Sequence, residues 1–276
     1  AFTLYDTDSG FGARSFMPNL AITFDWLYDS PLYNATIKQQ VLNRLLAAPT
    51  LPSNDPTYGT SGGWFHYASQ PESAGGGYSS DQPISNYNSG FQIGRMLASI
   101  AVEGEDARAA AWVTDSLTRY NQARTKIDTE IPGGHWPEGW NYGPGVYERH
   151  LMVASAMAQY RNDNTYKTWN WITNTHLSKI HSLAPDARYF YDDGLWSGDT
   201  TGDPRYNDMM VAGFTYGWGT PAGQRVKAYI DRVVAAGGAS LPDHWIPFLF
   251  LDPSAQAANF NTLPRAFHAT GAGLVT

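Results

Sequence analysis

The chain has 276 residues, of which 42% are hydrophobic and 16% are charged, so it can bury a core and is too apolar for a disordered chain. Its net charge of −7 disfavours a general nucleic-acid binder, which usually carries a basic excess. There is no apolar run of about 18 residues, so we expect no membrane-spanning helix. The first residues lack the pattern of a signal peptide. Cysteine is absent, which excludes disulfides, thiolate metal sites and a cysteine nucleophile.

Apolar residues at helical spacing predict an all-α protein with about eight helices and almost no strand. In chain order, the helices are expected near 20–30, 37–46, 93–101, 109–120, 146–160, 169–180, 207–218 and 226–234. Thr220 and Pro221 predict a helix start, with an N-cap followed by proline at the first helical position. No second boundary is visible, so we expect one domain over 1–262. The last residues, 263–276, change from helical spacing to a strand-like tail.

The predicted connections alternate between short and long. The long ones are 49–84, 132–144, 185–206 and 238–261. In a stack of antiparallel helix hairpins, alternate connections emerge at opposite ends, so the long loops would share one face. Long loops without regular structure are usually functional. We therefore expect these loops to form the main groove.

Aromatic residues are abundant, with 10 Trp, 17 Tyr and 12 Phe. Such a content is typical of surfaces that stack on flat ligands such as sugar rings, and the alternative is an aromatic-rich helical core. The long loops hold the candidate stacking and binding residues Trp64, His66 and Trp196. The loop 185–206 also holds aspartates that could bind Ca²⁺, namely Asp192, Asp193, Asp199 and Asp203. Their spacing does not follow an EF-hand pattern, so we expect no metal or other cofactor.

Polar residues stand at the start of one predicted helix, directly after the first long loop. Asn86, Tyr87 and Asn88 could hydrogen-bond a carboxylate or carboxamide there. The alternative is simple capping of the helix by Ser85 or Asn86.

The second long loop contains the densest cluster of acid/base groups in the chain, flanked by tryptophans. Tyr142 could exchange a proton with a substrate, and His135 and Glu138 could assist. The alternative is that Glu138 caps a helix and Tyr142 packs in the core. The tryptophans of this loop, Trp136 and Trp140, are candidate stacking surfaces.

Four segments resemble, in order, the α/α-toroid domain of polysaccharide lyases of the heparinase II/III and alginate lyase type. Residues 20–29 are similar to the family's A-x-x-Y-D-W-L-Y-D helix, and Asn86-Tyr87-Asn88 with Gly90 resembles its Asn-Trp-Asn or Asn-Asn-His segment. Residues 134–142 resemble its G-G-x-x-x-E-G-x-x-Y segment. The tail 263–276 resembles the linker and first strand that lead into the family's β-sandwich.

The resemblance implies an (α/α) toroid of antiparallel helix hairpins, complete or incomplete, that cleaves a uronic-acid-containing polysaccharide by β-elimination. It implies that Asn86 holds the uronate carboxylate, that Tyr142 exchanges a proton at the glycosidic oxygen or C5, and that a histidine serves as base. It also implies a β-sandwich domain missing from this chain and a secreted or periplasmic protein. The chain departs from the family at Tyr87, where alginate lyases have histidine.

Two other functions remain open at this point. An inverting glycoside hydrolase on the same architecture would need two carboxylates, such as Glu138 with Asp193 or Asp199. A non-catalytic glycan-binding module would have aromatic residues lining a groove without a polar constellation. Each of these three functions implies a polysaccharide or oligosaccharide partner, and none implies nucleic acid or membrane.

Overall fold

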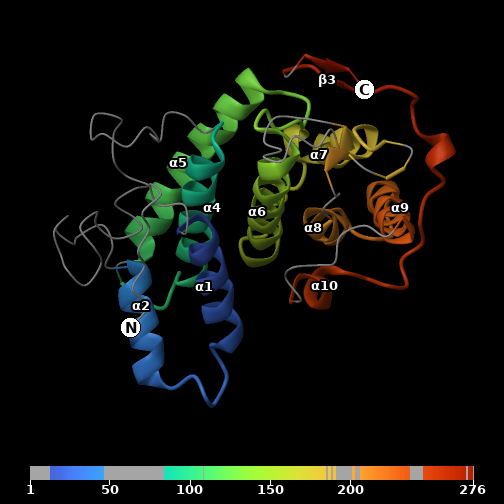
Figure 1. Ribbon diagram of the computed structural model, residues 1–276. Helices are drawn as coiled ribbons and strands as arrows, with labels where there is room; N and C mark the ends of the chain where they lie inside the picture. Colours follow the sequence, from blue (N-terminus) through green and yellow to red (C-terminus); the bar gives the residue numbers. More distant parts are fainter. Residues whose placement is uncertain are drawn as a thin grey trace. The chain divides into compact units, whose positions relative to one another are not determined.

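The computed structural model describes residues 13–46, 84–107, 109–184, 186–187, 189–190, 201–202, 206–236, 245–271 and 273–275. Within these ranges the chain forms nine α-helices and only four strands of two residues each, so the predicted all-α class is confirmed (Figure 1). None of the helices found there is both long and apolar enough to cross a membrane. The chain divides into two compact units, Ala1–Thr125 and Lys126–Thr276.

The first unit contains α1 (Ala13–Leu27), α2 (Ala35–Leu46), α4 (Asn86–Ala101) and most of α5 (Ala109–Glu130). Helices α1 and α4 pack along each other, and Phe24, Ile93 and Met96 are fully buried. Burial of such side chains supplies the main stabilisation of a helix pair, because it removes apolar surface from water.

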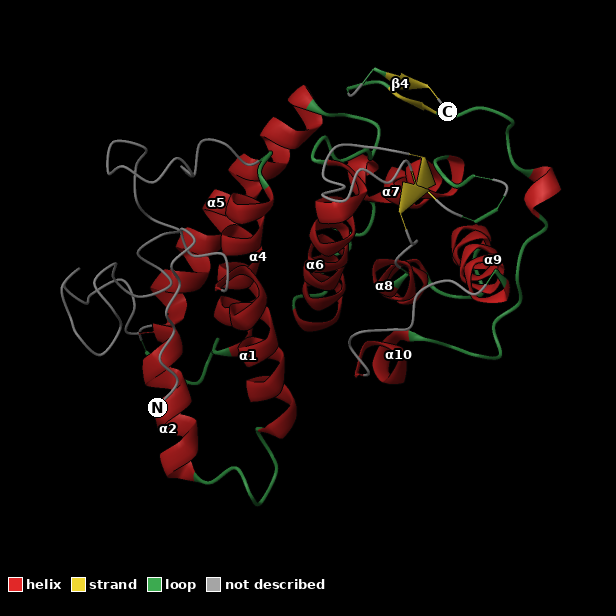
Figure 2. Cartoon of the chain, in the orientation of Figure 1, coloured by secondary structure: helices red, strands yellow, loops and turns green. Residues whose placement is uncertain are grey.

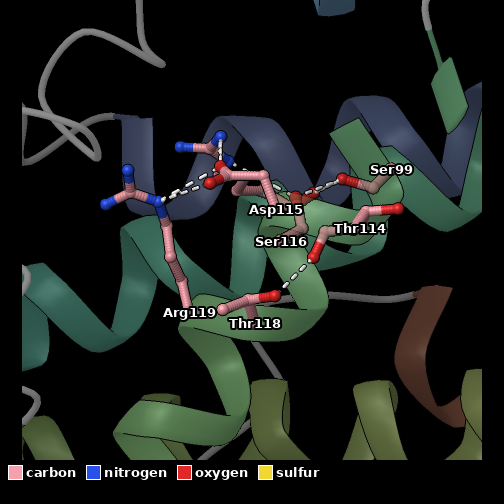
Figure 3. Close-up of polar contacts among 7 residues, drawn as sticks. Ser99, Thr114, Asp115, Ser116, Thr118 and Arg119 are labelled. Carbon is pink, nitrogen blue, oxygen red and sulfur yellow. Dashed lines mark hydrogen bonds and ion pairs between the residues drawn. The ribbon is translucent and has the colours of Figure 1, made fainter. Parts of the chain in front are cut away.

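Helices α4 and α5 are joined by a polar network around Asp115 (Figure 3). The Asp115 carboxylate accepts hydrogen bonds from the guanidinium groups of Arg95 and Arg119. Beside it, the hydroxyls of Ser99 and Ser116 lie 2.6 Å apart and both side chains are buried. The network fixes the register of α4 against α5, because each buried polar group needs its partner.

The second unit contains α6 (Gly139–Tyr160), α7 (Asn170–His181), α8 (Asn207–Tyr216), α9 (Pro221–Ala235) and α10 (Trp245–Phe250). Helix α8 packs against α6, α9 and α10, and its residues Met209, Met210 and Val211 are buried. The predicted start of α9 is confirmed, since the Thr220 hydroxyl accepts a hydrogen bond from the Gly223 N–H at 3.1 Å.

A buried ion pair links α7 to α8. Lys179 and Asp208 are 0% and 2% exposed in their side chains, and the ammonium group donates to the carboxylate. Removing one partner of such a pair leaves an uncompensated buried charge, whereas the intact pair adds little net stability. The pair therefore specifies how α7 and α8 meet.

The strands form two short antiparallel hairpins. Strand β1 (Tyr189–Phe190) pairs with β2 (Thr201–Gly202), and β3 (His268–Ala269) pairs with β4 (Leu274–Val275). A short 3₁₀ helix, Phe260–Thr262, precedes the second hairpin. The strand-like tail predicted from the sequence is a hairpin in the structure, because the chain folds back and β3 pairs with β4 (Figure 2).

The expected alternation of short and long connections fails at α6. Helix α6 begins at Gly139, so Trp140, Tyr142 and Pro144 are helical and the connection before them is only 131–138. The alternation predicts a short connection after α6, but that connection, 161–169, is at least as long as the connection 131–138 before α6. Pro144 and its flanking glycines predicted a loop, but Gly143 lets Trp136 pack closely: a Cβ there would lie 3.3 Å from Trp136 Cβ. Tertiary packing has overridden local propensity.

Candidate functional site

The residues with the strongest predicted chemistry lie on one segment, 131–142, which we call the α6 start. It consists of the connection 131–138 and the first turn of α6. Its backbone bends through positive φ angles at Gly133, Gly134 and Gly139, of 100°, 82° and 70°. Such angles are readily adopted by glycine and strain most other residues, so these glycines give the segment its shape.

Trp136 anchors the α6 start. Its backbone N–H donates to the Tyr147 hydroxyl at 2.7 Å, and its indole N–H donates to the Glu138 carboxylate at 2.9 Å. Its ring meets the edge of Trp171, with centroids 6.0 Å apart. Trp136 is 0% exposed. A sugar ring could stack on it only after these neighbours moved, so the structure places it in the core rather than on a binding surface.

Other buried tryptophans show the same pattern. Trp112, Trp140, Trp169 and Trp171 are 9%, 8%, 4% and 0% exposed. In the second unit these rings pack on one another and on histidine, with His135 5.7 Å from Trp140 and His150 5.3 Å from Trp171. For these residues, the alternative of an aromatic-rich core is the one that the structure supports.

Glu138 occupies the N-cap position of α6 but makes no side-chain capping hydrogen bond. Its carboxylate instead accepts the Trp136 indole N–H. The alternative of capping is therefore wrong for Glu138. The half-buried carboxylate is held by the residue that anchors the segment.

His135 is 6% exposed and lies against α7. Its Nδ1 is 3.3 Å from the Ser178 hydroxyl, and its ring contacts Trp140 edge-on. The hydrogen bond fixes the ring, since one imidazole nitrogen is engaged by a side chain that is itself buried.

Tyr142 follows Glu138 by one helical turn and is half-buried. The same face of α6 continues through Gly145 to Arg149, at intervals of three and four residues. A Cβ at Gly145 would lie 3.5 Å from Arg149 Nη1, so the guanidinium folds back over Gly145 toward the start of the helix. Sequence reasoning missed Arg149, although its spacing of seven from Tyr142 is the signal that could have identified it.

Asn86 begins α4 and is 3% exposed. The preceding Ser85 is extended, with φ −138° and ψ 136°, and makes no side-chain capping hydrogen bond. Capping by Ser85, the alternative to a functional role for the start of this helix, is therefore not what the structure shows. Asn86 belongs to the first unit and Tyr142 to the second. The placement of both residues in one site remains a prediction.

The remaining predicted site residues lie outside the described parts of the chain. The structure does not describe the side chains of Tyr87 and Asn88, nor any part of Trp64, His66, Trp196, Asp192, Asp193, Asp199 and Asp203. Within the ranges that it does describe, no three His, Asp or Glu side chains gather as metal ligands would.

A second polar cluster joins α7, α8 and α9, and no motif in the sequence indicated it. Burial, together with the nearby charge of Arg225, lowers the pKa of His176 to about 3. Arg225 Nε donates to His176 Nε2 at 3.4 Å, and the Tyr216 ring lies 5.1 Å from the imidazole. Burial raises the pKa of Tyr216, whose hydroxyl donates to the Ile172 carbonyl at 2.6 Å. These groups stay neutral except for Arg225 and hold the three helices together.

No family model, curated protein or solved structure matches the chain. A function for this protein must therefore be inferred from the side chains described above and from the resemblance of four segments to the lyase family. Of these segments, the α6 start has the most completely described contacts.

Proposed function

We propose that this protein is a polysaccharide lyase that cleaves a uronic-acid-containing polysaccharide by β-elimination, on an (α/α) toroid of helix hairpins. The observation that supports it most is the shared face of α6, where a carboxylate, a phenol and a guanidinium follow one another at helical spacing. These are Glu138, Tyr142 and Arg149. The first two come from the segment that resembles the family's G-G-x-x-x-E-G-x-x-Y motif.

The reaction that these groups suit breaks one carbon–oxygen bond. A base removes the proton at C5 of the uronate, the electron pair forms a C4–C5 double bond, and the C4–O bond breaks. The departing glycosidic oxygen then takes a proton. Tyr142 is the candidate for proton transfer at C5 or at the leaving oxygen, because it is half-buried and within reach of solvent.

Neutralising the uronate carboxylate lowers the barrier, since charge spreads onto it as the C5 proton leaves. Asn86 is the candidate donor that the resemblance supplies. Arg149 is a second candidate, because guanidinium pairs with carboxylate in a bidentate fashion. His135 is the candidate base, and its bond to Ser178 would orient it.

The test is absorbance at the band of the unsaturated uronate, measured with the purified chain across a panel of polyuronates. A neutral glucan serves as the control. The proposal expects the band to grow with at least one polyuronate and not with the glucan. Reducing ends without the band would instead indicate the hydrolase. Binding without any product would indicate a glycan-binding module, and either result would contradict the proposal.

A further inference from the structure

The C-terminal tail makes direct backbone contact with the α6 start. The Gly271 N–H donates to the Pro132 carbonyl at 2.8 Å, and Ala269 beside it is fully buried. Both Gly271 and Ala269 belong to the segment 267–275, which contains β3 and β4 (Figure 2) and which we call the tail hairpin. A segment at the end of the chain therefore touches the segment that bears the candidate site.

Two glycines make this contact close. A Cβ at Gly133 would lie 2.8 Å from Ala269 Cα, and one at Gly271 would lie 2.3 Å from Pro132 Cδ and 2.4 Å from Ile131 Cα. Carbon atoms do not normally approach so closely, so no other side chain fits at either position without a shift of backbone. The two segments are complementary at the level of the main chain.

Helix α7 holds the other side of the α6 start. A Cβ at Gly134 would lie 2.5 Å from the Asn174 carbonyl carbon, and the next residue, His135, is bonded to Ser178. The same helix also holds the tail hairpin, because His181 stacks on Phe267 with centroids 5.8 Å apart and an interplanar angle of 18°. The connection 131–134 is thus enclosed between α7 and the tail hairpin.

We propose that the tail hairpin is a positioning element for the candidate site: by docking on Ile131–Gly133 it holds the backbone that carries His135 and Glu138. The structural part of this inference stands on the contacts alone, and its consequence for catalysis rests on the proposed function. Docking restricts the loop because its glycines would otherwise allow many backbone conformations. A preorganised loop keeps reacting groups in place for the transition state.

The experiment compares Gly271→Ala with Gly273→Asn in the full chain. Alanine at 271 introduces the clash with Ile131 and Pro132. Gly273 has φ 65° and open space around it, so asparagine, which tolerates that conformation, is the matched control. Amide hydrogen exchange is followed in 133–138, with α8 and α9 as internal references in the same molecule.

The inference expects Gly271→Ala to speed exchange in 133–138 about tenfold or more while α8 and α9 keep their protection. Gly273→Asn should leave both unchanged. Unchanged protection of 133–138 would overturn the inference, and so would equal loss of protection in every helix, because a general loss of stability requires no positioning role. If Gly271→Ala does not fold, Phe267→Ala, which removes the stacking on His181 and leaves the glycine contacts in place, gives the same test with a smaller expected effect.

The exchange experiment needs no substrate, so its outcome is separate from that of the lyase assay. Absence of lyase activity in the wild-type chain would contradict the proposed function and leave the structural inference standing on the exchange data. Where activity is present, Gly271→Ala should lower kcat with little change in KM, because misplaced groups weaken the transition state more than binding. Faster exchange in 133–138 with unchanged kcat would overturn the catalytic consequence.

Discussion

The starts of α4 and α6, which carry the candidate site residues, are built in different ways. Before α4, Ser85 is extended and leads into the buried Asn86, and before α6 Glu138 follows a loop bent by glycines. Neither N-cap residue uses its side chain as a cap. At α6 the carboxylate instead binds the indole that anchors the loop. A residue type that commonly caps helices therefore does not identify a cap by itself.

The difference also shows what holds each site residue. Asn86 depends on the packing of α4 against α1 and on the network that joins α4 to α5. The α6 start depends on main-chain contacts with α7 and the tail hairpin. Side-chain substitutions should thus perturb the start of α4 most, and glycine substitutions the start of α6.

The largest effect is expected for Tyr142→Phe, which removes the hydroxyl and keeps the ring. If Tyr142 transfers a proton, kcat on the active polyuronate should fall by about 10²- to 10⁴-fold. Tyr160→Phe, at the exposed end of the same helix, should have no effect. Activity of Tyr142→Phe within a factor of two of the wild type would remove Tyr142 from the mechanism.

Asn86→Ala should lower turnover by about 10²-fold, the effect of losing one donor to a developing negative charge. Because Asn86 is buried, the thermal midpoint is measured alongside, and Asn121→Ala on the exposed surface of α5 is the control. Normal turnover of a folded Asn86→Ala variant would show that the start of α4 has no part in catalysis.

Glycine substitutions compare the surroundings of α4 and α6 by stability. Gly134 and Gly104, just after α4, both have positive φ angles, of 82° and 89°, so alanine strains the backbone at either position. At Gly134, however, the Cβ also meets Asn174 and Thr175, whereas at Gly104 it meets nothing within 4 Å. Gly134→Ala should therefore cost about 1–3 kcal/mol more free energy of unfolding than Gly104→Ala. Equal denaturation midpoints would show that α7 does not hold the α6 start.

Arg149→Gln should raise KM for an acidic polysaccharide about tenfold and leave kcat unchanged, if Arg149 binds a substrate carboxylate. The matched control is Arg161→Gln, at the C-cap of the same helix. Lower kcat at constant KM would place Arg149 in the chemical step instead, and equal effects of both variants would reduce its role to general charge.

The last prediction concerns pH and lies away from both helix starts. Since the pKa of His176 is about 3 in the folded protein and 6.5 ordinarily, the unfolded chain binds one more proton between these values. The free energy of unfolding should therefore fall as pH drops from 6.5, by at most about 1.4 kcal/mol per pH unit from this residue. His176→Gln should show a shallower dependence in denaturant titrations. Parallel curves for the two proteins would contradict the buried, neutral state of His176.

Sequence periodicity predicted most helices because a buried face repeats along each of them, as in α8 and α9. It failed at the beginning of α6, where Gly139 and Pro144 are typical of loops. The reason is a set of contacts distant in sequence: Gly143 lets Trp136 approach, and Gly134 lets the α7 backbone approach. The pairing of β3 with β4 and the docking of Gly271 on Pro132 have the same cause, since no local pattern encodes which segment fills a space left by glycine.

The site residues divide along the same line. Glu138 and Tyr142 are candidates by residue type and by the resemblance, and their proximity in the structure was predictable because both belong to one short segment. The burial of Trp136 was not, since an indole suits a core and a sugar surface equally well. Arg149 was missed because the sequence analysis placed Tyr142 in a loop, so the spacing of seven between the two residues was not read as one face of a helix.

The most direct test of β-elimination is the fate of water in the reaction. The active polyuronate is digested in water labelled with the heavy oxygen isotope, and the products are weighed by mass spectrometry. A lyase breaks the bond without adding water, so we predict unlabelled products whose masses sum to that of the substrate, one of them carrying the unsaturated uronate. Products that together gain one labelled oxygen per cleavage would show hydrolysis and would contradict β-elimination.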